Sequence, residues 1–158
     1  MTPCRAAPIS RGSTSVSDPI SLRPVGFVRN GIRHRHDMPP GGVPSEILIL
    51  PRYRKALFRI NTRKRLWILC HFHQADTSVL RARPRKKKII GGVHRGVFAM
   101  RSPDRPNPVS LTLVTLKSCR RGVLRVDRMD AVSGTPVIDI KSCLEIPERP
   151  RAKRKRIR

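Results

Sequence analysis

The sequence predicts an all-β fold, a small single-sheet β-barrel with one or two short helices and disordered basic termini. Its apolar segments are short, rich in Val, Ile and Leu, and bounded by Gly, Pro, Asn or Ser, as is typical of barrels and sandwiches. The 158 residues suffice for a single modest core. We therefore expect one barrel domain over residues 23–148, between a disordered arm at 1–22 and a basic tail at 149–158.

The expected strands follow one another at short intervals along the chain. They are residues 23–30, 45–50, 65–72, 96–100, 110–117, 123–132 and 136–144. Alternate residues of 65–72 share a face, and both faces are largely apolar, with Leu66 and Ile68 on one and Trp67 and Leu69 on the other. This strand is therefore expected at the centre of the sheet, with its end emerging in a polar region.

One segment between the strands has helical periodicity. Residues 51–60 begin with a proline and continue with apolar residues at helical spacing, which predicts a helix. Residues 81–92, which carry a run of Arg and Lys, are expected to form an extended basic loop.

The charge of the chain predicts an anionic partner. Thirty-five Lys and Arg against ten Asp and Glu give a formal net charge of +25, far more than solubility requires. Nucleic acid is the favoured partner and anionic membrane the weaker alternative, because no run approaches the roughly 18 apolar residues of a spanning helix. Since aromatic residues make up only 4% of the chain, phosphate contacts rather than base stacking should supply most of the affinity.

Neither the cysteines nor the histidines form a strong metal-binding pattern. The four cysteines contain no CxxC pair, which argues against a zinc ribbon and favours a reduced, cytoplasmic protein. The pairs His34/His36 and His71/His73 could each share a strand face, but few carboxylates lie nearby to complete a ligand set. We expect no metal. The arm lacks the apolar centre of a secretory signal, and an organellar transit peptide is its alternative interpretation.

Three segments begin as apolar strands and end in polar residues: 66–76, 96–111 and 129–141. A rigid sheet can deliver a site from several strand ends in this way. The middle segment holds its polar residues on a backbone stiffened by prolines, and these polar residues are Arg101, Ser102, Asp104, Arg105 and Asn107. Either this loop is preorganised for a ligand, or Asp104 and Arg105 merely pin the turn.

The order and spacing of HFHQAD, GVFAMRSPDRPNPVSLT and DAVSGTPVIDIKSC resemble the TsaA-like, or TrmO, family of tRNA methyltransferases, over residues 23 to about 148. The resemblance implies a β-barrel, an S-adenosylmethionine cofactor and a homodimer with sites near the subunit interface. It also implies a substrate, N6 of threonylcarbamoyl-adenosine beside the tRNA anticodon.

The resemblance also carries over site residues. Those implied for the cofactor are His73, Gln74, Arg101, Leu111 and the turn of Asp130, Ala131, Val132, Ser133 and Gly134. Those expected to contact RNA are Arg105, Asn107, Arg85, Lys86, Lys87 and Lys88. No catalytic base is assigned. Met100, Ser110 and Ser133 depart from the family motif, so the alternative function is a catalytically inactive RNA-binding protein on the same barrel.

Overall fold

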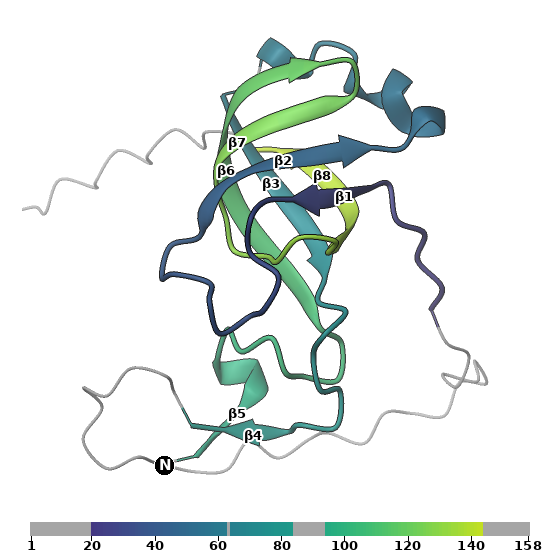
Figure 1. The fold of residues 1–158 in the computed structure, drawn as a ribbon. Coiled ribbons are helices and arrows are strands. Elements are labelled where there is room, and N and C mark those ends of the chain that lie inside the picture. Colours follow the sequence, from purple (N-terminus) through teal and green to yellow (C-terminus); the bar gives the residue numbers. More distant parts are fainter. Residues whose placement is uncertain (1–19, 63, 84–93, 144–158) are drawn as a thin grey trace, which may run out of the picture.

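The computed structural model describes residues 20–62, 64–83 and 94–143. The basic tail, most of the arm, and Arg85 and Lys86–Lys88 lie outside the described residues. Six antiparallel strands close into a barrel in the order β1-β2-β7-β6-β3-β8, which confirms the predicted fold class (Figure 1). These strands are β1 (Gly26–Arg29), β2 (Val43–Ile49), β3 (Arg65–His71), β6 (Val109–Arg120), β7 (Val123–Met129) and β8 (Pro136–Ser142).

The barrel interior is filled by every second residue of each strand. In β3, Leu66, Ile68 and Cys70 point inward and are almost fully buried, while Trp67 and Leu69 are half-buried on the outer face. The strand pairs with β6 on one side and β8 on the other, so its expected central place is confirmed. The remaining core residues are Val28, Ile47, Ile49, Val114, Leu124, Val126, Met129, Ala131 and Val137.

The segment expected as a strand at 96–100 is different. Only Arg95–Gly96 form a strand, β5, which pairs with β4 (Arg81–Ala82) inside the region expected as a loop. Residues Val97–Ala99 form a short 3-10 helix, η3. Only Val97 of this helix is buried, so the segment has no apolar face that a longer strand could bury.

The helix expected at 51–60 is a 3-10 helix, η1 (Pro51–Leu57), followed by a second short one, η2 (Ile60–Thr62). Phe58 and Arg59 separate them, because Phe58 has ψ 127° and Arg59 has φ 59°, and neither conformation continues a right-handed helix. The strand expected at 123–132 ends at Met129, where the backbone turns.

The barrel has two ends with different surroundings. Strand β3 begins after η2 and ends before residues 72–76, so η1 and η2 lie at one end of the barrel and the polar segments at the other. We call these the cap end and the site end. Figure 1 shows the cap end at the top and the β4–β5 sheet beyond the site end. No helix in the described ranges is long and apolar enough to cross a membrane.

Candidate functional site

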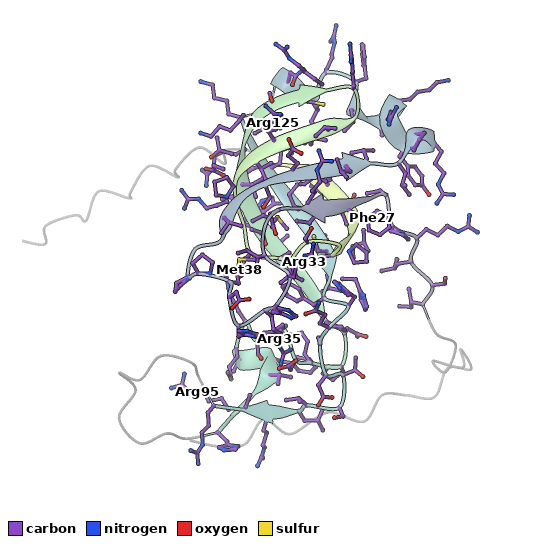
Figure 2. All side chains as sticks on the ribbon, in the orientation of Figure 1. Phe27, Arg33, Arg35, Met38, Arg95 and Arg125 are labelled. Carbon is purple, nitrogen blue, oxygen red and sulfur yellow. The ribbon has the colours of Figure 1, made fainter. Side chains whose placement is uncertain are left out.

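The connection between β1 and β2 joins the three segments singled out in the sequence. The Ile32 carbonyl accepts the Ser133 amide at 2.7 Å, and the Arg33 carbonyl accepts the Gln74 side-chain amide at 3.3 Å. Arg35 forms an ion pair with Asp104. Arg33 and Arg35 lie between the barrel and the β4–β5 sheet (Figure 2). Residues from 30 to 35 thus hold the polar ends of all three segments at one end of the barrel.

Asp104 is the centre of the polar contacts at this end. Its two carboxylate oxygens accept from Arg35 Nη1 at 2.5 Å and Nη2 at 3.1 Å, a two-point contact that fixes both groups. The first oxygen also accepts the backbone amide of Asp76 at 2.9 Å. Because Arg35 Nη1 lies 3.4 Å from the Gln74 carbonyl as well, one guanidinium connects two of the loops.

The Arg35 guanidinium lowers the pKa of Asp104, with a further contribution from the Asp76 amide. The Asp104 carboxylate in turn raises the pKa of Arg35. The pKa of Asp76 is also lowered, because its side chain accepts hydrogen bonds from the hydroxyl and backbone amide of Ser78. All three groups are therefore charged at neutral pH.

Replacement of Asp104 by asparagine should lower the free energy of unfolding by about 1 kcal/mol at pH 7, since the pair is partly exposed. A carboxyl whose folded pKa is depressed contributes stability above its unfolded pKa, about 3.9, and loses it as the pH falls through the folded value. Urea unfolding should therefore give wild type and Asp104→Asn the same free energy of unfolding at a pH below the folded pKa of Asp104. Asp37→Asn, an exposed carboxylate beside His36, is the control. A difference that persists undiminished in acid would contradict this role.

Arg105 is held by its own loop. Its Nε donates to the Ser102 carbonyl at 2.8 Å, and its Nη2 donates to the carbonyls of Val97, at 2.9 Å, and Met100. The turn-pinning interpretation therefore describes both Arg105 and Asp104, while the RNA contact expected of Arg105 stays a prediction. The loop is fixed further where the Phe72 amide donates to the Pro108 carbonyl at 2.8 Å.

Asn30 fixes the turn of residues 130–134. Its side-chain nitrogen donates to Ser45 Oγ at 2.9 Å and to the Ala131 carbonyl at 3.0 Å, while its side-chain oxygen accepts the Ile32 amide at 3.0 Å. Gly134 has φ +84°, a conformation that glycine adopts most easily. The protein's own hydrogen bonds therefore hold the turn in place.

The residues expected to bind the cofactor divide by exposure. Ala131 and Val132 are buried, so their side chains support the turn. The side chains open to solvent are those of His73, Gln74, Arg101, Leu111 and Asp130, together with Asn107 from the expected RNA set. Within the described part of the chain, Arg101 and Asp130 form no ion pair or side-chain hydrogen bond with protein. These two charges are thus available to a ligand.

The three departures from the motif have identifiable surroundings. Ser110 is buried and lies opposite Cys70 in the β3–β6 ladder, so its Cβ points into the barrel. It does not obstruct the outer surface. Ser133 places its hydroxyl 3.5 Å from the Asn30 amide, in support of the turn. Met100 is half-buried, and its carbonyl accepts from Arg105.

The cysteines and histidines form no centre in the described residues. No three groups among His, Cys, Asp and Glu are placed there to hold a metal ion. The rings of His34 and His36 stack, with centroids 5.5 Å apart. Burial raises the pKa of the Cys70 thiol to about 12, so this thiol is neutral and unreactive at physiological pH.

Asn30 and Arg35 were not predicted as site residues from the sequence. Neither residue lies in the three segments, and both act by holding those segments together. A signal was present for Asn30, a polar residue at the end of an apolar strand and next to a glycine. Arg35 offered none, because it is one of 35 basic residues.

Comparison with known proteins gives relatives over most of the chain. Residues 31–146 match the family model of the tRNA-methyltransferase O N-terminal domain. A "Probable S-adenosyl-L-methionine-binding protein" of Methanothermobacter thermautotrophicus is 43% identical over 130 residues, which cover 80% of this chain and 91% of the relative. The "tRNA (adenine(37)-N6)-methyltransferase" of Escherichia coli is 35% identical over 135 residues, which cover 78% of this chain and 57% of the enzyme.

A solved structure has a similar fold. The crystal structure of TrmO superposes with a TM-score of 0.66 at 26% identity, covering 87% of this chain and 63% of that one. The chain therefore spans nearly all of the archaeal relative and somewhat more than half of the bacterial enzyme.

Proposed function

The chain belongs to the TrmO family, and from that membership we propose that it is an S-adenosylmethionine-dependent methyltransferase acting on N6 of an adenosine in tRNA. The observation that carries the proposal is the convergence of three family segments at one end of the barrel, held by residues 30–35. The finer proposal is that the adenosine is threonylcarbamoyl-adenosine beside the anticodon. The proposed compartment is the cytoplasm.

The residues at the site end fit S-adenosylmethionine, which supplies an electrophilic methyl group on a positively charged sulfur. Asp130 is an exposed carboxylate that can balance this charge, since Asp104 is already paired with Arg35. A Cβ on Gly134 would meet nothing within 4 Å, so the surface of the turn is open to a ligand. Leu111, 57% exposed on β6, offers an apolar contact for the adenine ring.

The proposed work of the chain is positioning and electrostatic balance. A rigid turn and a proline-stiffened loop hold their groups in place before substrate arrives, which lowers the cost of orienting two reactants. Arg101 holds the cofactor or a phosphate of the RNA, and His73 and Gln74 border the cofactor. We assign no general base to the proton lost from N6.

The RNA side of the site is proposed to depend on charge. A net charge of +25 attracts a polyanion over a long range. Arg105 and Asn107 lie on the loop beside Arg101, and the run of Arg85 and Lys86–Lys88 is proposed to add phosphate contacts. Binding should therefore weaken steeply with salt.

A homodimer is proposed on the outer face of β3 and β6. Val109 and Leu111 are exposed there, beside the half-buried Leu69 and Leu113. Burial of this apolar strip against a second copy would place the Leu111 side of the cofactor site at the interface.

The experiment is methyl transfer from labelled S-adenosylmethionine to tRNA with and without the threonylcarbamoyl group. Label should appear on N6 of the modified adenosine and should be absent from the unmodified tRNA. Transfer to both tRNAs would retain the coarser activity and reject the finer substrate. Transfer to neither, with cofactor binding intact, would contradict the enzyme proposal.

The alternative is a catalytically inactive RNA-binding protein on the same barrel. The observation that favours it is Ser133, which lacks the negative charge that the family motif carries at this position. If the wild-type protein is inactive, Ser133→Asp tests whether the missing negative charge is the cause or whether the protein only binds RNA. Recovery of methyl transfer would assign the inactivity to that charge, and no recovery would support the alternative.

A further inference from the structure

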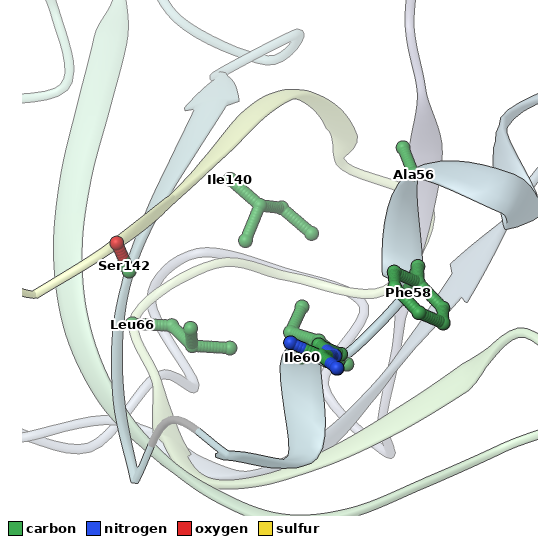
Figure 3. A pocket seen from close by; sticks show the side chains of 7 residues that line it. Ala56, Phe58, Ile60, Leu66, Ile140 and Ser142 are labelled. Carbon is green, nitrogen blue, oxygen red and sulfur yellow. The ribbon is translucent and has the colours of Figure 1, made fainter.

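An exposed aromatic ring stands at the cap end, far from the candidate site. Phe58 is 82% exposed and lies between two surface hollows of about 460 and 480 Å³. In Figure 3, which shows the first hollow, Leu66 and Ile140 lie on the barrel side and Phe58 lies opposite them. The second hollow is lined by Arg54, Lys55, Leu57, Phe58, Cys119 and Gly122.

The backbone exposes the Phe58 ring. The Phe58 amide donates to the Lys55 carbonyl at 3.2 Å at the end of η1, and Arg59 then adopts φ 59°. This reversal lets Leu57 and Ile60 pack against the core while Phe58 stays outside. A left-handed arginine has a cost in free energy, and such conformations often occur at functional positions.

Positive charge surrounds the ring. Residues 51–65 contain seven Lys and Arg and no acidic residue. The hairpin between β6 and β7 lies alongside, since a Cβ at Gly122 would be 2.5 Å from Arg54 Nε, and it adds Arg120 and Arg121. Ion pairs in the described ranges use Arg29, Arg35, His36, Arg125, Arg128 and Lys141. None uses Arg54, Lys55, Arg120 or Arg121.

Cations lie next to the Phe58 ring on the side of each hollow. The Arg59 guanidinium lies 5.5 Å from the ring centroid and also lines the first hollow. The second hollow is lined by Phe58 together with Arg54 and Lys55, so a flat group placed there would lie beside the ring and two cations. An aromatic face beside unpaired cations is the combination that binds a nucleobase and its flanking phosphates.

We propose that the cap end is a second RNA-binding site, where a base stacks on Phe58 and phosphates contact Arg54 and Lys55. The identity of the partner as RNA rests on the proposed function. The seven residues of β3 separate this site from the methyl-transfer end by roughly 20 Å, at about 3.3 Å per residue. One tRNA can therefore contact both ends. The low aromatic content of the sequence predicted little stacking, and at the cap end the structure exposes the Phe58 ring beside these cations.

The test compares Phe58→Leu with Phe58→Trp in binding an unmodified tRNA transcript. Stacking predicts roughly tenfold weaker binding for Phe58→Leu and wild-type affinity for Phe58→Trp. Arg54→Gln should remove about one phosphate contact, so the slope of log affinity against log salt concentration should become less steep by about one unit. Arg29→Gln, the same charge change on an arginine paired with Glu46, should leave the slope unchanged.

Equal affinity of wild type and Phe58→Leu would overturn the cap-end site, and so would equal slopes for Arg54→Gln and Arg29→Gln. Titration of the same proteins with S-adenosylmethionine separates the two proposals. The cap-end variants should bind it as wild type does. Absence of cofactor binding in wild type would contradict the proposed function, while the Phe58 comparison would still decide whether the cap end binds RNA.

Discussion

Replacement of Gly42 by alanine should destabilise the barrel more than any other single methyl added to its surface loops. Gly42 has φ +78°, and a Cβ there would lie 2.7 Å from the backbone carbon and oxygen of Met129 and 3.0 Å from the Asp130 amide. The left-handed conformation costs about 1–2 kcal/mol, and displacement of packed groups adds about 1–3 kcal/mol. The displaced backbone is the start of the proposed cofactor turn, so cofactor affinity should fall as well.

Gly41→Ala is the matched control. Gly41 also has positive φ, +94°, but nothing lies within 4 Å of a Cβ built on it. Urea unfolding should therefore show only the conformational cost for Gly41→Ala and both costs for Gly42→Ala. Equal losses for the two variants would show that the contact with Met129 carries no penalty.

Replacement of Asn30 by alanine should produce the second large effect. It removes three hydrogen bonds and leaves the Ser45 hydroxyl and the Ala131 carbonyl without their donor, both in buried residues. A buried polar group left unpaired costs about 1–3 kcal/mol, so we expect the free energy of unfolding to fall by about 2–3 kcal/mol. The turn at 131–134 should also loosen, which weakens cofactor binding.

Two further variants identify the cause. Asn30→Asp keeps the size and the oxygen that accepts the Ile32 amide, but it replaces the donor with a second oxygen facing the Ala131 carbonyl. It should therefore fail to restore stability or cofactor affinity. Asn61→Ala, at an exposed asparagine in η2, should leave both unchanged. Full recovery with Asn30→Asp would contradict the donor role, because Asp keeps only the size and the oxygen that accepts the Ile32 amide.

The barrel could be predicted because the apolar segments of the sequence are short and are bounded by turn residues. Alternation in β3 identified the buried face, and the ladders to β6 and β8 confirm its central position. Residues 96–100 were predicted wrongly, because an apolar run of five residues does not reveal that only Val97 is buried. The turn at Phe58 and Arg59, which follows η1 and includes the positive φ of Arg59, had no signal in the sequence either.

The candidate site was predictable only in part, for a physical reason. Polar residues at strand ends mark the loops, but contacts between loops depend on which pairs meet in three dimensions. Arg35 reaches Asp104 across 69 positions of sequence, and Asn30 reaches Ala131 across 101. In a chain with 35 basic residues, composition cannot single out the arginine that organises the site.

Calorimetric titration of S-adenosylmethionine into the folded protein and into Arg101→Ala is the decisive test for a cofactor site at this end of the barrel. Arg101 is exposed and has no side-chain hydrogen bond or ion pair in the described residues, so its removal should leave the fold intact. We expect a saturable heat of binding in wild type that is strongly reduced in Arg101→Ala. No heat in the folded wild-type protein at high cofactor concentration would contradict a methyltransferase site at this end of the barrel.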